Sequence, residues 1–268
     1  MDIFDLFTHG FIQRALIAGS FIAILCSTLG VFLVLRRLSL IGDGLAHVSF
    51  GSVAVGLFLR TYPFYVAVPI VMLSALGILK LVEKARLYGD SAIGIVSSLG
   101  IAVGILIASI AGGFNVDLFS YLFGNILAIN TTEVAISIVL SVILVIVILF
   151  FYQELLSITF DEESAKASGI RTERINKILV LLTALTVVLA MKLVGIMLIS
   201  ALLILPPVTA LQLARGFKAT IVISSLAGIT SVILGIAISF MANLPTGATI
   251  VIINFIFFLS SFTYRRWK

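Results

Sequence analysis

The stretch VAISIVLSVILVIVILFFY, residues 134–152, decides the fold class of this chain. It is an apolar run interrupted only by Ser137 and Ser141, and it carries no charged residue. An α-helix needs about 20 such residues to cross the hydrocarbon core of a bilayer. A transmembrane strand would instead alternate apolar and polar residues in segments of about ten. The stretch therefore predicts a membrane-spanning helix and argues against a transmembrane barrel.

The whole chain has the composition of such helices. Of its 268 residues, 61% are hydrophobic and 11% are charged, whereas charged residues make up about 25% of a soluble domain. Mean hydropathy is +1.28. The single Cys26 excludes a disulfide framework and a cysteine metal cluster. The first ten residues hold two acids and no Lys or Arg, so we expect the first helix to be retained and not cleaved as a signal peptide.

Apolar blocks bounded by charges, Gly and Pro predict nine crossings, with eight as the alternative because the second block is short. Short pieces at 38–43 and 118–128 are interpreted as interfacial or re-entrant segments. No stretch between the spans is long enough for a soluble domain, so residues 1–268 are predicted to form one all-α, polytopic membrane domain. The predicted helices lie at about 12–35, 44–60, 64–82, 92–112, 132–152, 174–191, 193–213, 219–241 and 247–264.

Basic residues predict the orientation through the positive-inside rule. If the loops at 36–37, 80–90, 153–177 and 214–218 and the C-terminal tail face the cytoplasm, they hold fourteen of the seventeen Lys and Arg residues. We therefore expect the N-terminus outside and the C-terminus in the cytoplasm, which requires an odd number of crossings and favours nine over eight. The net charge of +5 is spread over short loops and gives no indication of nucleic-acid binding.

The segment RRLSLIGDGLAHVSFGSVAVG, residues 36–56, carries the candidate site. Asp43 and His47 are four residues apart, so a helix places them on one face. A carboxylate within a bilayer is costly and marks a functional site by default. An oxygen and a nitrogen ligand could hold zinc, manganese or ferrous iron. The pair alone leaves a second interpretation equally open, in which the Asp caps a helix start and the His bonds to a neighbouring helix.

Small residues follow one another along the same segment, from Gly44 to Gly56. They allow close approach of helix backbones, so we expect this span to be packed on several sides. Asp43 and His47 are then expected to face protein or a water-filled path, and not lipid.

The longest polar stretch, residues 153–177, is predicted to be cytoplasmic. Its middle, Asp161 to Ser168, can form a short helix opened by acids and closed by Gly169. A helix this short is marginal in water without a tertiary partner. Two interpretations stay open, an amphipathic helix at the membrane surface or a docking element for a soluble protein.

Pro206 and Pro207 interrupt the apolar segment 194–216 and remove two backbone donors. They predict a broken helix inside the bundle or beside a cavity, with a structural kink as the alternative. The sequence contains no G-x-x-x-x-G-K-[ST], H-E-x-x-H or G-x-S-x-G motif. The chain is therefore not expected to hydrolyse ATP itself or to be an enzyme of the zinc-protease or esterase type.

Five stretches, taken together, carry a family resemblance across nearly the whole chain. They resemble the permease subunits of the zinc and manganese ABC transporter family. The stretches are RRLSLIGDGLAHVSFG (36–51), SYLFGNIL (120–127), FDEESAKASGI (160–170), VGIMLISALLILPPVTALQLAR (194–215) and LPTGATIVI (244–252).

The resemblance implies the type II importer architecture of cobalamin and siderophore permeases, in the plasma membrane of a bacterium or archaeon. Family members form a homodimer with two cytoplasmic ATPase subunits and receive metal from an extracytoplasmic receptor. Asp43 and His47 would coordinate the passing metal, no permanently bound cofactor is expected, and Pro206 and Pro207 would break a helix near the path. The ATPase-coupling residues would be Asp161, Glu162, Glu163, Ser164, Ala165, Ser168 and Gly169.

Two other transport functions are considered. A siderophore or cobalamin permease would need a wide apolar path and would leave the Asp43 and His47 pair unexplained. An ion-coupled secondary transporter would typically show inverted repeats, and we find no convincing repeat in this sequence. Among the metals, we favour zinc over manganese, with iron also compatible with these ligands.

Overall fold

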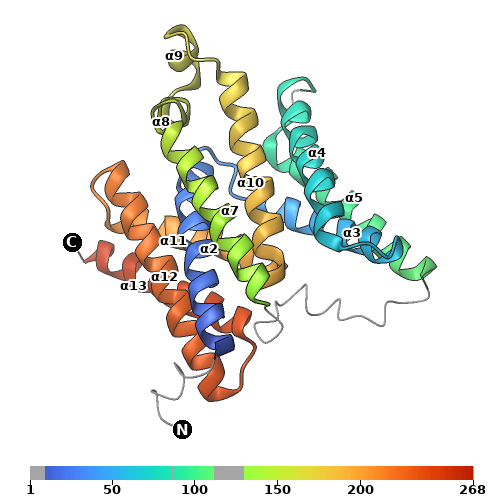
Figure 1. The fold of residues 1–268 in the computed structure, drawn as a ribbon. Coiled ribbons are helices and arrows are strands. Elements are labelled where there is room, and N and C mark those ends of the chain that lie inside the picture. The colour runs from blue at the N-terminus through green and yellow to red at the C-terminus, as the bar shows by residue number, and fades with distance from the viewer. Residues whose placement is uncertain (1–9, 86, 112–129, 268) are drawn as a thin grey trace.

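The computed structural model describes residues 10–85, 87–111 and 130–267, and it is helical throughout these ranges, with no strand in them (Figure 1). A helix lies at each of the nine predicted positions. Eight of these helices are long and apolar enough to cross a membrane, and the apolar part of the ninth, Leu198–Leu213, is shorter. The nine are α2 (Gly10–Leu35), α3 (Ile41–Phe58), α4 (Pro63–Glu83), α5 (Gly89–Ile110), α7 (Thr131–Phe150), α10 (Thr172–Val194), α11 (Ile196–Leu213), α12 (Phe217–Ala242) and α13 (Thr246–Arg266).

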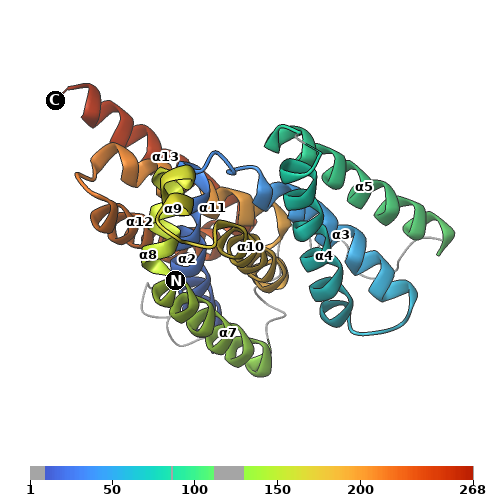
Figure 2. The same ribbon diagram turned by 90° about the horizontal axis from the view of Figure 1, so that it is seen from above.

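The helices form two groups that lie side by side in both views (Figures 1 and 2). One group consists of α3, α4 and α5, and the other of α2, α7 and α10 to α13. The groups meet where α10 packs against α3 and α4 and where α11 packs against α3. Helix α3 therefore contacts α4 and α5 on one side and α10 and α11 on the other, as its small residues predicted.

The larger group is built around α2, which contacts α7, α10, α11 and α12. Of the apolar stretch of α2, 67% is buried inside the protein. Phe32 near its end is fully buried and packs edge-on against Phe217 of α12, with ring centroids 5.2 Å apart. Small residues lie where other helices approach α2 most closely, Gly19 against Val232 of α12 and Gly30 against Leu203 of α11.

The prediction of a helix break at Pro206 and Pro207 is wrong. Helix α11 runs through both prolines, and the interruption in this region is at Gly195, whose φ of 89° separates α10 from α11. A contact between α2 and α11 accommodates one of the two lost backbone hydrogen bonds. Pro207 cannot donate to the carbonyl of Leu203, and this carbonyl meets Gly30 of α2, where an added Cβ would lie 2.2 Å from the oxygen. The glycine lets the α2 backbone cover the unpaired oxygen, where its Cα–H can donate a weak hydrogen bond.

The polar stretch after α7 contains two short helices. Helix α8 (Tyr152–Phe160) was not predicted and follows α7 after the single residue Phe151, while α9 (Glu162–Ala167) lies within the predicted range 161–168. In Figure 1 both lie at one end of the molecule, where α9 projects beyond the bundle. The predicted segment 118–128 lies outside the described residues.

The contact between Gly30 and Leu203 generates a test of the fold. Replacing Gly30 by Ala places a methyl group against the Leu203 carbonyl and the Pro207 ring, so α2 and α11 must separate. Overpacking of this kind costs about 1–3 kcal/mol, and we expect a lower melting temperature for the purified protein in detergent. Gly77→Ala is the matched control, because a Cβ on Gly77 of α4 meets nothing within 4 Å. Equal melting temperatures for Gly30→Ala and Gly77→Ala would contradict the close contact of α2 with α11 at Gly30.

Candidate functional site

The rotation of α3 about its axis is fixed by backbone contact with α5. A Cβ added to Gly51 would lie 2.4 Å from the carbonyl oxygen of Gly100, and one added to Gly100 would lie 2.7 Å from Cα of Val48. Only glycine allows two helices to approach this closely. The face of α3 that bears Val48 and Gly51 is therefore held against α5, and Asp43 and His47 lie beside this contact with side chains that stay partly exposed.

Asp43 and His47 come together on α3 as their spacing predicted. Asp43 lies in the first turn of the helix, where the helix dipole favours a carboxylate. The His47 Nε2 and Asp43 Oδ2 atoms are 3.6 Å apart, and the two side chains are 34% and 51% exposed, respectively. This separation is too long for a hydrogen bond, so the two groups are neighbours whose lone pairs stay available to a ligand.

Ser200 of α11 is the third member of this site and was missed from the sequence. Its hydroxyl donates to Asp43 Oδ1 at 3.1 Å and leaves Oδ2 on the side of His47. The contact orients the carboxylate and joins α11 to the first turn of α3. A single serine in an apolar helix usually bonds to its own backbone, so the sequence carried no signal for this contact.

The pair supplies one oxygen and one nitrogen ligand. Elsewhere in the described residues no group of three or more His, Cys, Asp or Glu side chains could hold a metal ion. A four-coordinate ion at Asp43 and His47 would therefore need ligands from outside this part of the chain, such as water, another molecule or a second copy. The exposure of both side chains leaves that side of the site open.

Helix α9 has the ends that its sequence predicted. The Asp161 side chain accepts a hydrogen bond from the Ser164 amide at 3.0 Å and so caps the helix start. Gly169, with a φ of 87°, ends it, and the amide of Ile170 returns to the carbonyl of Ala165 at 3.1 Å. Ala165 is buried, while Glu163 and the residues from Lys166 to Gly169 are exposed.

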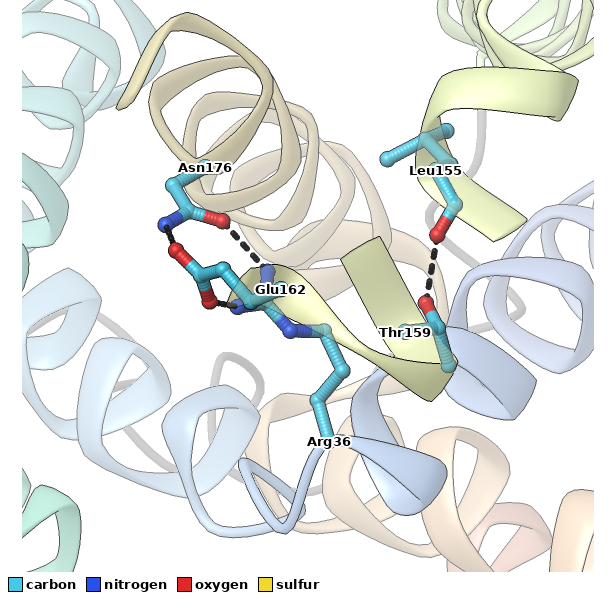
Figure 3. Close-up of polar contacts among 5 residues, drawn as sticks. All are labelled: Arg36, Leu155, Thr159, Glu162 and Asn176. Atoms are coloured by element: carbon cyan, nitrogen blue, oxygen red, sulfur yellow. Dashed lines mark hydrogen bonds and ion pairs between the residues drawn. The ribbon is translucent and has the colours of Figure 1, made fainter. Parts of the chain in front are cut away.

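Glu162 differs from its neighbour because two donors hold its carboxylate, although its side chain stays 42% exposed. Its Oε2 accepts from Arg36 Nη2 at 2.6 Å, and its Oε1 accepts from the Asn176 amide at 2.7 Å (Figure 3). Arg36 Nη1 closes the ring by donating to Asn176 Oδ1 at 2.5 Å. Burial lowers the pKa of the Arg36 guanidinium, and the Glu162 and Glu83 carboxylates oppose this shift. The three residues thus join α9 to the end of α2 and the start of α10.

From the sequence alone, Arg36 was one of many basic loop residues, and Asn176 was not singled out. The distribution of basic residues already predicted that the segments 36–37 and 153–177 lie on the same side of the membrane. It could not show which of the acids in the second segment would meet Arg36. That choice depends on how α9 folds back onto α10.

Comparison with known proteins agrees with this architecture. The family model described as the ABC 3 transport family matches residues 8–265. The manganese transport system membrane protein MntC of Listeria monocytogenes is 35% identical over 97% of this chain and 92% of its own length. The high-affinity zinc uptake system membrane protein ZnuB of Haemophilus influenzae is 34% identical over 94% of this chain and 97% of its own length.

Solved structures show the same fold. The structure of PsaBC from Streptococcus pneumoniae in complex with Fab has a TM-score of 0.87 and is 36% identical, covering 97% of this chain and 94% of that chain. The fold is thus shared with a relative of clear sequence similarity. With a family model and relatives that span almost its full length, this chain belongs to the ABC 3 transport family, as a multi-pass permease subunit of a metal ABC transporter in the plasma membrane.

Proposed function

We propose that this chain is the membrane subunit of an ATP-driven importer for Mn²⁺ or Zn²⁺, with Asp43 and His47 as the ligands that the ion meets on its path. The observation that supports this most directly is the pair itself, an imidazole and a carboxylate 3.6 Å apart and partly exposed within a permease of this family. The charge of Asp43 compensates for the water that a divalent ion loses when it enters.

The site is completed by a second copy of the chain. One copy offers two ligands on an exposed face of α3, and a two-fold axis beside that face would bring two such pairs together. Four nitrogen and oxygen ligands suit a borderline divalent ion. When the two copies separate, each keeps only two ligands, so the ion is released. Transport needs this compromise between binding and release.

The energy for the cycle comes from two separate ATPase subunits that bind at α9. The exposed carboxylate of Glu163 and the residues from Lys166 to Gly169 form the contact surface. In the orientation proposed from the basic residues, α8 and α9 face the cytoplasm. An extracytoplasmic receptor delivers the metal on the opposite side, and the permease holds no permanent cofactor.

Relatives of nearly equal identity are named for manganese and for zinc, so similarity does not separate the two metals. The ligand set is compatible with both. The importer's cargo is the metal whose cellular content falls when the chain is deleted and whose addition restores growth. Elemental analysis of the parent strain, the deletion strain and the complemented deletion strain therefore assigns the metal.

Substitution of the ligand pair tests the proposed path. Asp43→Asn removes the charge with little change of shape, and His47→Ala removes the nitrogen ligand. Changes in the surroundings of a metal ligand already cost about 10- to 100-fold, so each variant is expected to lower cellular uptake of ⁵⁴Mn or ⁶⁵Zn by at least that factor. Ser200→Ala, which leaves both ligands in place, is expected to have a smaller effect. Normal uptake by Asp43→Asn and His47→Ala at equal membrane abundance would exclude the assignment.

Charge reversal on α9 tests the ATPase contact. Glu163 is exposed in the first turn of α9, so Glu163→Lys places a positive charge at the proposed interface and leaves the Asp161 cap in place. We expect less ATPase to co-purify with this variant. Glu173→Lys on α10 is the control, since Glu173 pairs with Lys177 on the protein surface. If both variants retain the ATPase to the same extent, α9 is not the main contact.

A further inference from the structure

The two adjacent acids of α9 have different surroundings. Glu163 is exposed, whereas Glu162 is held by two donors, the Arg36 guanidinium and the Asn176 amide. The Arg36 side chain is 12% exposed and Asn176 is 6% exposed. A charged pair with several hydrogen bonds is much stronger than an isolated surface pair. Any movement of α9 therefore acts on Arg36.

Arg36 is the first residue of the short link between α2 and α3, and backbone hydrogen bonds hold this link in one conformation. The amide of Arg37 bonds to the carbonyl of Val34 at 3.1 Å, and the amide of Leu38 bonds to that of Leu33 at 2.8 Å. These two bonds form a Schellman motif at the end of α2. Arg37 takes the left-handed position in it, with a φ of 58°, which a glycine usually occupies. The motif fixes the place of Arg36 on the end of α2.

The link continues directly into the first turn of α3. The amide of Ile41 bonds to the carbonyl of Leu38 at 3.0 Å, and the amide of Gly44 bonds to that of Leu40 at 3.0 Å. Asp43 lies within this hydrogen-bonded segment. A displacement of Arg36 therefore moves the start of α3 together with its carboxylate.

A second route leads from the same cluster to the same carboxylate. Asn176 belongs to α10, which connects through Gly195 to α11, and Ser200 of α11 donates to Asp43 Oδ1 at 3.1 Å. The cluster of Arg36, Glu162 and Asn176 thus lies at the start of both chain segments that lead to Asp43, the link from α2 to α3 and helix α10. Packed helices pass such movements on as rigid bodies.

From these contacts we infer that Arg36 is a positioning residue that couples α9 to the metal ligands. The ion pair with Glu162 carries the movement of α9, and the closed link carries it to Asp43 and His47. This inference rests on the proposed function and adds the residues that join its two sites. It requires that breaking the pair uncouples ATP hydrolysis from metal movement while the subunits stay assembled.

The test uses the complete importer, with its ATPase and receptor, reconstituted in proteoliposomes. Uptake of ⁵⁴Mn or ⁶⁵Zn and release of phosphate are measured in the same vesicles. Glu162→Gln keeps the shape and removes the charge, and Arg36→Lys keeps the charge and removes the forked geometry. We expect either variant to lower the metal taken up per ATP by about 2- to 30-fold, the usual range for coupling networks. Hydrolysis and ATPase co-purification should persist.

Glu173→Gln is the matched control, because it also removes a carboxylate that pairs with a cation, Lys177 at 2.5 Å, but on the surface of α10. Its uptake per ATP should equal that of the unchanged chain. The double variant Arg36→Lys with Glu162→Gln should be no worse than the single variants, since both remove the same interaction.

Three results would overturn the inference in distinguishable ways. Unchanged uptake per ATP in both single variants would show that the pair carries no coupling. Loss of the ATPase from Glu162→Gln would make Glu162 a docking contact instead. Absence of ATP-dependent uptake by the unchanged importer would remove the proposed function itself, and the coupling role with it.

Discussion

The constraint on which this structure depends is the need to pair backbone polar groups where no water can bond to them. Helices satisfy it along the spans, so the difficult positions are helix ends and prolines. Each is resolved by a specific contact. The end of α2 is closed by a Schellman motif, the start of α9 by the Asp161 side chain, and the carbonyl freed by Pro207 is covered by Gly30. The charged clusters of the molecule lie next to these closures.

Close packing at small residues then determines where the functional groups point. Hydrophobic driving force is weak between helices in lipid, so packing and hydrogen bonds hold them together. The backbone contact between Gly51 of α3 and Gly100 of α5 fixes one face of α3. Beside this contact, Asp43 and His47 keep partly exposed side chains, and Asp43 accepts a hydrogen bond from Ser200 of α11.

The position of the nine long helices and the pairing of Asp43 with His47 could be predicted, because both follow from local patterns, a run length and a spacing of four residues. The acid-capped helix at Asp161 was also predictable from its end residues. The continuation of α11 through Pro206 and Pro207 was not, because it depends on Gly30 in a helix far away in sequence. The cluster of Arg36, Glu162 and Asn176 escaped prediction for the same reason.

Two polar pairs, Arg36 with Glu162 and Asp43 with His47, differ in their geometry and therefore in their roles. Arg36 and Glu162 are 2.6 Å apart, share Asn176 as a partner and tie three helices together. Asp43 and His47 are 3.6 Å apart, partly exposed and on one helix, so their attraction contributes little to folding. A carboxylate kept in an apolar span without a strong partner is costly. In the function proposed above a passing cation would be that partner, which is why we assign the metal to the looser pair and not to the tighter one.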